Sequence, residues 1–159
     1  MSFEARIKEL GLTLPETPRP VANYVPAVQV GTLIFASGQT PTVSGQLLMK
    51  GKLGRDLSIE QGQEAARQAL LNILAAVRSL TSTLDVIKRI VKLNGWVASA
   101  EGFGSQPQVV NGASVLLEEI FGEAGKHARA AIGVAELPSG APVELELIVE
   151  VQHAKGENE

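Results

Sequence analysis

The sequence contains no cysteine and very little histidine. The absence of cysteine excludes disulfides, thiolate catalysis and zinc sites built on sulfur. The two histidines, His127 and His153, are isolated, with neither an acid nor a second histidine at ligand spacing. The sequence therefore predicts no metal site and two surface histidines.

The chain is also poor in positive charge, in aromatic residues and in long apolar runs. The chain has 14 basic against 17 acidic residues and an aromatic content of 4%. It therefore lacks the excess of positive charge that binds a phosphate backbone and has few aromatic side chains on which nucleobases could stack, which disfavours nucleic-acid partners. No stretch approaches the length needed to span a bilayer, and the charges among the first ten residues are untypical of a signal peptide. We therefore expect a cytoplasmic protein that has no membrane partner.

What the chain does contain is typical of one compact domain. Its 159 residues are 45% hydrophobic and 19% charged, which is enough apolar surface for a single core. We expect that domain to cover residues 1–152. Its first part, about residues 1–26, is rich in proline and predicts an extended surface arm. Residues 153–159 are predicted to form a solvated tail.

Turn and alternation patterns predict β-strands early in the chain. Apolar residues 28–30 and 33–36 flank Gly31-Thr32, and a glycine at the first position of a two-residue loop is typical of a type II′ hairpin. A third short strand is expected near residues 46–49, after a Ser-Gly turn.

Two segments have the period of amphipathic helices. The first begins at Ser58, whose spacing to Gln61 is typical of a capping box, and the second begins at Ser105 and ends before Gly122. The expected apolar faces are Ala66, Ala69, Leu70, Ile73, Leu74, Val77 and Leu80 in the first helix, and Val109, Val110, Ala113, Leu116, Leu117, Ile120 and Phe121 in the second.

The remaining segments predict further strands and complete the fold. Residues 86–99 have strand character, with Asn94-Gly95 indicating a bulge, and two strands close the chain. This order predicts an α+β fold, a two-layer domain in which two helices pack on one face of a mixed sheet of about six strands. The last strand alternates over residues 143–151, and its acidic face is expected to be either solvated or buried against another subunit.

Arg129 is the most informative residue of the sequence. It lies in an apolar segment typical of a buried strand, where a guanidinium needs acceptors, and its planar fork fits a carboxylate in bidentate fashion. Turn residues separate this segment from the strand that contains Glu144. We therefore expect a hairpin that places Glu144 opposite Arg129. The partner of Arg129 would then be Glu144 or Glu146, in a structural ion pair, or the carboxylate of a ligand.

Three segments resemble the reactive intermediate deaminase family, also called YjgF-like. They are Tyr24 to Gln39, ending in Ile34-Phe35-Ala36-Ser37-Gly38-Gln39, then Val109-Val110-Asn111-Gly112, and His127-Ala128-Arg129 through Leu137-Pro138 to Val143-Glu144-Leu145-Glu146. The resemblance extends from about residue 20 to about residue 152. Residues 91–99 and the proline-bearing N-terminus are more similar to a divergent YjgF-like subgroup.

The resemblance implies a chorismate-mutase-like fold and a homotrimer with a ligand cleft at each subunit interface. It also implies a reaction without metal or organic cofactor, in which imines and enamines such as 2-iminopropionate and 2-aminoacrylate are hydrolysed to a 2-keto acid and ammonia. By this resemblance Arg129 binds the substrate carboxylate and Glu144 acts at the reacting end. Matching pocket positions, some from across the interface, are Tyr24, Ser37, Gly38, Asn111 and Ala131, the last of which is a cysteine in many members.

Three functions are compatible with these residues. In an enamine/imine deaminase, a hydrolase, Arg129 orients the substrate while Glu144 positions water or transfers a proton, with its pKa lowered if it lies beside Arg129. In a non-catalytic trimeric module that binds small carboxylates or keto acids, the same arginine binds and Glu144 is a solvated acid. Ribonuclease activity, which is attached to the family by name, is disfavoured by the charge and by the lack of a catalytic histidine arrangement.

Overall fold

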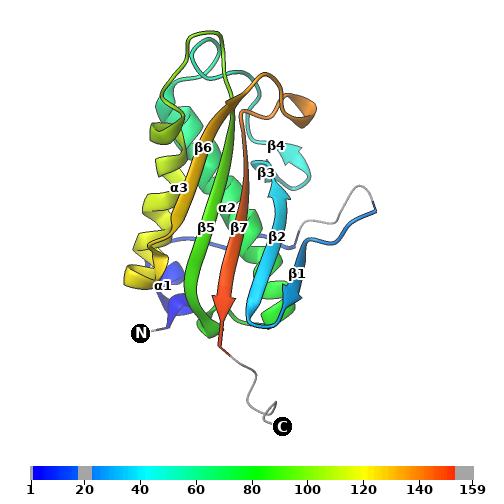
Figure 1. Ribbon diagram of the computed structural model, residues 1–159, viewed down its shortest axis with the longest axis vertical. Helices are drawn as coiled ribbons and strands as arrows, with labels where there is room; N and C mark the ends of the chain where they lie inside the picture. The colour runs from blue at the N-terminus through cyan, green and yellow to red at the C-terminus, as the bar shows by residue number, and fades with distance from the viewer. Residues whose placement is uncertain (1, 18–22, 153–159) are drawn as a thin grey trace.

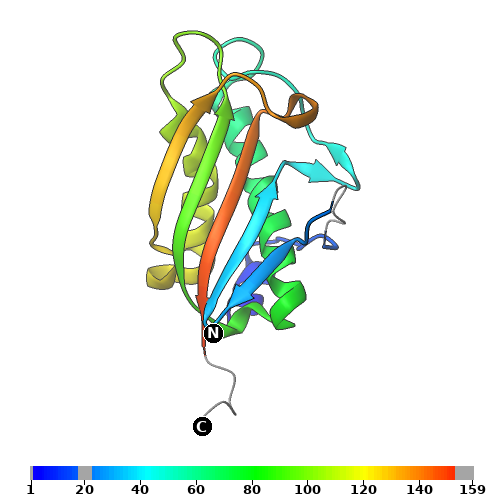
Figure 2. The same ribbon diagram turned by 45° about the vertical axis from the view of Figure 1, so that its right-hand side comes forward.

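The computed structural model describes residues 2–17 and 23–152, which form two layers (Figure 1). Figures 1 and 2 show the two long helices, α2 (Ile59–Thr81) and α3 (Gln106–Phe121), together on one face of a five-stranded sheet. The spatial order of its strands is β1 (Ala27–Val30), β2 (Leu33–Gln39), β7 (Val143–Val151), β5 (Ile87–Ala98) and β6 (Ala128–Val134). The shorter elements are α1 (Phe3–Glu9), β3 (Thr42–Val43), β4 (Gln46–Leu47) and the 3₁₀ turns η1 (Leu84–Val86), η2 (Gly122–Gly125) and η3 (Pro138–Gly140).

The predicted α+β two-layer fold with a mixed sheet and two covering helices is confirmed. Only β5 and β6 are parallel, and the other neighbours in the sheet are antiparallel. The main sheet has five strands instead of about six, because the strand expected near residues 46–49 is β4, which pairs with β3 in a separate two-stranded sheet. The predicted hairpin is β1–β2, closed by a Val30–Leu33 pair with Gly31 at φ 60°.

Local signals define the start of α2 and the end of α3. Ser58 and Gln61 form the predicted capping box at the start of α2, and Gly122 caps the end of α3. All of the expected apolar positions are buried except Leu80, which is 45% exposed in the last turn of α2, beyond the last buried residue, Val77.

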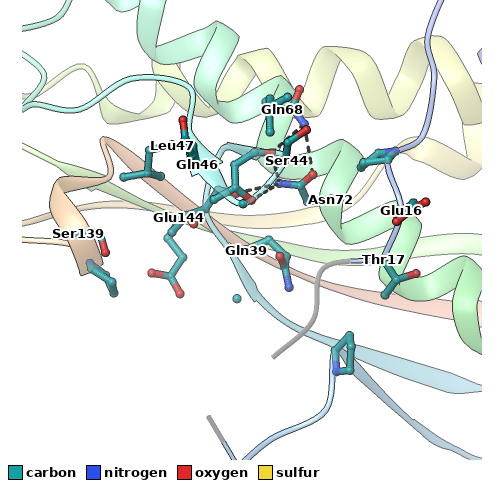
Figure 3. A pocket seen from close by; sticks show the side chains of 18 of the residues that line it. Glu16, Thr17, Gln39, Ser44, Gln46, Leu47, Gln68, Asn72, Ser139 and Glu144 are labelled. Atoms are coloured by element: carbon teal, nitrogen blue, oxygen red, sulfur yellow. Dashed lines mark hydrogen bonds between the residues drawn. The ribbon is translucent and has the colours of Figure 1, made fainter. Parts of the chain in front are cut away.

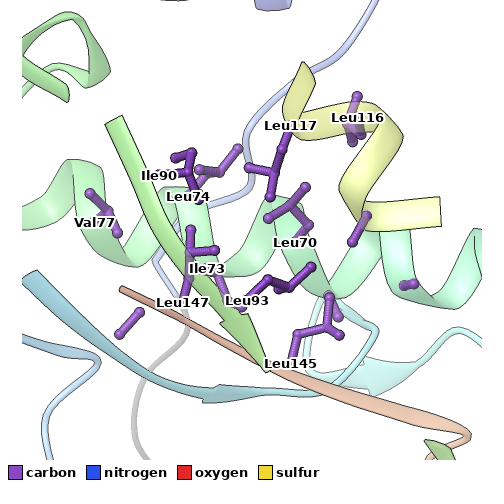
Figure 4. Packing of buried hydrophobic residues seen from close by; sticks show 14 of the residues in the cluster. Leu70, Ile73, Leu74, Val77, Ile90, Leu93, Leu116, Leu117, Leu145 and Leu147 are labelled. Carbon is purple, nitrogen blue, oxygen red and sulfur yellow. The ribbon is translucent and has the colours of Figure 1, made fainter. Parts of the chain in front are cut away.

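The core lies between these helices and the central strands. Figure 4 shows Leu70, Ile73 and Leu74 of α2 between Leu117 of α3 and the sheet. On the sheet side the fully buried large residues include Ile90, Leu93, Leu145 and Leu147. Burying side chains of this size contributes about 1.5–3 kcal/mol each, so this interface accounts for most of the apolar stabilisation of the fold.

Gly112 allows α3 to approach α2 at close range. A Cβ at this position would overlap the backbone carbonyl oxygen of Gln63 and lie 2.7 Å from the Cα of Gln63. The Gln63 side chain donates to the backbone oxygen of Gln108 at 2.8 Å, which links the two helices beside the contact. The helix spacing therefore depends on a residue without a side chain.

The N-terminal arm expected over about residues 1–26 is partly helical, which corrects that prediction. Ser2 caps α1 by accepting from the backbone N–H of Ala5, and Ile7 is buried. Glu4 accepts a hydrogen bond from the backbone N–H of Leu84 at 2.9 Å, which fixes α1 to the turn η1. The structure describes residues 12–17 without helix or strand, and the predicted tail, with His153, lies outside the described residues.

The bulge predicted at Asn94-Gly95 is also wrong. Their pairing with Glu146 and Leu145 continues in register, and the irregularities of β5 lie earlier, between Ile87 and Lys92. Gly95 has a packing role instead, because a Cβ there would lie 2.6 Å from a methyl group of Val110 in α3.

The two closing strands do not form the expected hairpin. β5 lies between β6 and β7 and pairs with both, parallel to β6 and antiparallel to β7. β5, α3 and β6 form a strand–helix–strand crossover, which places consecutive parallel strands side by side. Strand β6 is therefore an edge strand of the sheet.

None of the helices in the described residues is long and apolar enough to cross a membrane.

Candidate active site

Arg129 lies on the edge strand β6 and is exposed, which corrects the prediction of a buried strand. It is paired with Leu93 of the core, so its side chain lies on the helix-facing side of the sheet. There its Nη1 donates to Asn111 Oδ1 at 2.7 Å and to Ser114 Oγ at 3.2 Å. Both acceptors come from α3, so this helix holds the guanidinium.

The opposite edge of the guanidinium is available to a ligand. Both hydrogen bonds use Nη1, and Nε and Nη2 make none with any other described residue. These two nitrogens present parallel N–H donors that match the two oxygens of a carboxylate. Arg129 therefore offers a bidentate anion site whose orientation α3 sets.

His127 supports this arrangement and is not the surface residue that the sequence predicts. Its half-buried ring places Nδ1 2.6 Å from the backbone oxygen of Gly125 and Nε2 2.9 Å from Ser114 Oγ. Since a carbonyl oxygen only accepts, Nδ1 donates its proton to Gly125, and Nε2 lies within hydrogen-bond distance of the Ser114 hydroxyl. We call Arg129, Asn111, Ser114 and His127 the arginine half-site.

Ala131 and Ser114 are further neighbours of Arg129, Ala131 on β6 and Ser114 on α3. Ala131 is paired with Gly95 and is half-buried against the core, so it shapes the surface near Arg129 without adding a polar group. Sequence reasoning missed Ser114. Its spacing of about one helical turn from Asn111 is the signal that could have found it, because this spacing places both side chains beside the same partner.

Glu144 lies on a different strand and on the opposite face of the sheet. Its neighbours Val143 and Leu145 are core residues, so its side chain points away from the helices. Burial raises the pKa of the half-buried Glu144 carboxyl, and the nearby charge of Glu146 raises it further. This direction is opposite to the lowering expected beside an arginine. Glu146 itself accepts from Asn94 Nδ2 at 2.7 Å, so it is not the partner of Arg129 either.

The other predicted pocket residues gather around Glu144 where β2 ends. A Cβ on Gly38 would overlap Oε1 of Glu144 and lie 3.3 Å from its Cδ, so only glycine leaves room for this carboxyl. Ser37 donates from its hydroxyl to the backbone oxygen of Val25 at 2.6 Å. This bond holds the segment that carries Tyr24 against β2. We call Glu144, Gly38, Ser37 and Tyr24 the glutamate half-site.

A cavity of about 1220 Å³ opens beside Glu144 (Figure 3). Tyr24, Gly38 and Glu144 line it, whereas Ser37, Asn111, Arg129 and Ala131 do not. The structure thus brings together only part of the predicted site. Among the described residues there is no group of three or more His, Asp or Glu side chains placed for a metal ion.

Within one chain the two half-sites cannot meet. The Cα atoms of Arg129 and Glu144 are separated by two strand spacings and by three residues along the sheet, on the order of 14 Å. In addition, Arg129 is on the helix-facing side and Glu144 on the other. The structural ion pair between them, one of the alternatives that the sequence left open for Arg129, is therefore absent within one chain.

Replacing the half-buried acid is expected to stabilise the protein at neutral pH. An acid whose pKa is raised in the folded state contributes stability below its unfolded pKa and loses it as the pH rises through the folded pKa. Glu144→Gln should therefore raise the denaturation midpoint at neutral pH, with the gain disappearing in acid.

Urea melts at fixed protein concentration and several pH values measure this difference. Glu101→Gln, at an exposed position, is the control and should follow the wild type at each pH. A Glu144→Gln variant less stable than wild type at neutral pH would contradict the prediction and would indicate a cation beside Glu144 that the single chain does not supply.

Comparisons with known proteins agree with the fold and the resemblance. The family model described as "YjgF/chorismate mutase-like, putative endoribonuclease" matches residues 4–150. Protein TCP17 of Trypanosoma cruzi is 42% identical over 150 residues, 94% of both chains. The 2-iminobutanoate/2-iminopropanoate deaminase of Dermatophagoides farinae is 29% identical over 89% of this chain and 95% of its own. The crystal structure of Atu1372 from Agrobacterium tumefaciens, described as having unknown function, superimposes with a TM-score of 0.88 and 47% identity over 94% of this chain and 92% of that one.

Proposed function

Because the chain belongs to the YjgF/chorismate mutase-like family, we propose that it is an enamine/imine deaminase for small amino-acid-derived intermediates. The observation that carries the proposal is the pair of half-sites, a guanidinium with an unused bidentate edge and a half-buried acid with a raised pKa. The relative from Dermatophagoides farinae supports it by its name. These groups suit the two ends of a 2-imino acid.

We further propose that a second copy of the chain completes the site. The two half-sites are different surfaces, so a contact between them is head-to-tail, and such contacts form a ring when their rotation closes. The family resemblance implies a ring of three. The exposed face of the sheet supports such an assembly, because Val28 and Phe35 form a cross-strand pair there and remain 48% and 42% exposed.

The proposed reaction is the addition of water to a protonated imine. Arg129 binds the substrate carboxylate through Nε and Nη2, which fixes the imine carbon near Glu144 of the next copy. As the water oxygen bonds to that carbon, Glu144 takes a proton from water and passes it to the nitrogen. The C–N bond then breaks while the hydroxyl oxygen forms the C=O bond and gives its proton to Glu144, which passes it to the departing ammonia, so that a 2-keto acid and ammonium leave. A raised pKa suits this role, because the carboxyl must both accept and return a proton near neutral pH.

The direct test uses 2-aminoacrylate, generated in situ from serine by a dehydratase. We expect the protein to accelerate its conversion to pyruvate and ammonia beyond the spontaneous rate. No acceleration at protein levels where a known deaminase works would overturn the proposal. Calorimetric binding of 2-ketobutyrate without any turnover would instead favour a carboxylate-binding module. We do not propose nuclease activity, since the one described histidine is engaged with Ser114 and Gly125.

Gly38→Ala is expected to lower kcat by about a hundredfold, because misplacing a reacting group by about 1 Å has effects of this size. The added methyl overlaps the end of the Glu144 side chain and no backbone atom of Glu144, so the carboxyl moves while the fold remains. Gly104→Ala, whose Cβ would contact nothing within 4 Å, is the matched control. Unchanged kcat in Gly38→Ala would show that the Glu144 position does not matter.

Ser114→Ala is expected to act on substrate binding instead. It removes one acceptor of Arg129 and, among the described residues, the one side chain that is hydrogen-bonded to His127. This should raise KM about tenfold with a smaller change in kcat, as for a lost hydrogen bond to a charged group. Ser105→Ala, at the N-cap position directly before the same helix, where the serine side chain makes no capping bond, is the control. A fall in kcat with unchanged KM would contradict the assignment of Arg129 to binding.

A further inference from the structure

The cavity beside Glu144 is larger than a three-carbon imino acid requires. Its volume of about 1220 Å³ exceeds the range of about 300–1,000 Å³ typical of sites for much larger ligands. It extends past the end of β2 from Glu144, on the outer face of the sheet, to Gln68 and Asn72 of α2, on the inner face (Figure 3). A short substrate held at Glu144 would leave the inner part unfilled.

The far wall of this cavity is built from polar groups that already satisfy one another. Asn72, only 1% exposed, donates from Nδ2 to the backbone oxygens of Thr40 and Thr42, both at 3.0 Å. Gln68 donates to the Thr42 backbone oxygen and to Asn72 Oδ1, both at 3.2 Å. This network fixes the start of the β3–β4 hairpin over the cavity and makes the wall rigid.

Of the two buried polar residues in this lining, Asn72 belongs to the network and Gln39 does not. The Gln39 amide makes no hydrogen bond to another described residue, and no side-chain nitrogen or oxygen among the described residues is both fully buried and unpartnered. The amide therefore reaches the open space of the cavity, where a ligand can form a hydrogen bond with it. Figure 3 shows the amide pointing into the space between Glu144 and Thr17.

A β-bulge gives Gln39 this direction. Two residues of β7, Leu147 and Leu145, pair with Ala36 and Gln39, so β2 carries one extra residue in between. The extra residue reverses the alternation, and Gln39 turns to the inner side of the sheet while Gly38 stays beside Glu144. The bulge thus places a carboxyl and an amide at successive points along one cavity.

We propose that Gln39 selects substrates with a neutral, hydrogen-bonding side chain of about the length of glutamine. This proposal rests on the proposed deaminase function and adds the substrate class. The amide both donates and accepts, which suits a carboxamide or sulfoxide group. The charged residues that line the cavity are Glu16, Glu144 and Lys50, and the carboxylate at the reacting end disfavours a second negative charge on the substrate side chain.

The test compares 2-imino acids generated in situ by an L-amino-acid oxidase. Imines from glutamine and norleucine match in length and differ in polarity, and those from methionine sulfoxide and methionine form a second pair that cannot cyclise through an amide. We expect kcat/KM to favour the polar member of each pair about tenfold or more, because a site built to hydrogen-bond a substrate rejects the analogue that lacks the group.

Gln39→Met should bring this ratio close to one in both pairs, and Gln29→Met, at an exposed position of β1 outside the cavity, should keep the wild-type ratio. A ratio is used because it survives a general loss of activity. If alanine and norleucine imines are hydrolysed and the polar members gain nothing, this inference is overturned and the deaminase function stands. If no imine is accelerated, both proposals are overturned. The wild-type ratios decide the matter even if Gln39→Met does not fold.

Discussion

Subunits carrying Arg129→Ala and subunits carrying Glu144→Ala should each be inactive alone and regain activity when they are refolded together. Each proposed site takes its arginine half-site from one copy and its glutamate half-site from the next, because β5 keeps the two apart within one chain. A site at which an Arg129→Ala copy supplies Glu144 and a Glu144→Ala copy supplies Arg129 is intact. In a random equal mixture about one quarter of the sites meet this condition, so about one quarter of wild-type activity should return.

The measurement is the 2-aminoacrylate assay on variants that are unfolded in urea, mixed and refolded at one protein concentration. The doubly substituted chain is the matched control, since mixing it with either single variant creates no intact site. Continued inactivity of the mixture, with wild-type protein recovering under the same treatment, would contradict a shared site. Activity of Arg129→Ala alone would contradict the role of the guanidinium.

Gly112→Ala should destabilise the fold, although alanine is the better helix former. The new Cβ would meet the Gln63 backbone, which cannot rotate away, so α2 and α3 must separate along the core. Overpacking of this kind costs about 1–3 kcal/mol, with larger values where backbone must move. Alanine returns about 1 kcal/mol through helix propensity, and we expect a net loss of about 2 kcal/mol.

Urea denaturation at fixed protein concentration measures the loss, because the stability of an assembly depends on concentration. Gly104→Ala again serves as the control, since its methyl contacts nothing. A midpoint for Gly112→Ala equal to or above the wild-type value would mean that the helices can move apart without cost. It would also remove the explanation for a glycine within α3.

The sequence predicts the long helices well because their signals are local. Ser58 and Gln61 are three positions apart, and Gly122 follows the last apolar residue directly. The short helix α1 is missed, since its stability comes from contacts with distant residues, such as that of Glu4 with Leu84, which no local pattern contains. The partner strand of the predicted β4, β3, is missed for the same reason, because Asn72 of α2 donates to the backbone oxygen of Thr42 in this strand.

The sequence predicts which residues belong to the candidate site, and it does not predict how they are arranged in space. Arg129 stands out because a guanidinium in an apolar segment needs acceptors, and the structure supplies Asn111 and Ser114. The hairpin prediction paired it with Glu144 because the two strands are consecutive. A strand, a 16-residue helix and another strand are also the pattern of a parallel crossover. In such a crossover β6 pairs with β5, so β5 lies between β6 and β7.

The position of β5 has a consequence for how the protein responds to dilution. A lone subunit keeps its core, its anion anchor and its acid, and still lacks a complete reaction centre. In the proposed ring of three, complete centres become rare once the protein is dilute enough to dissociate, because their number then follows the third power of the free subunit concentration. The rate of catalysis would therefore depend on the concentration of the chain far more steeply than the binding of simple anions does.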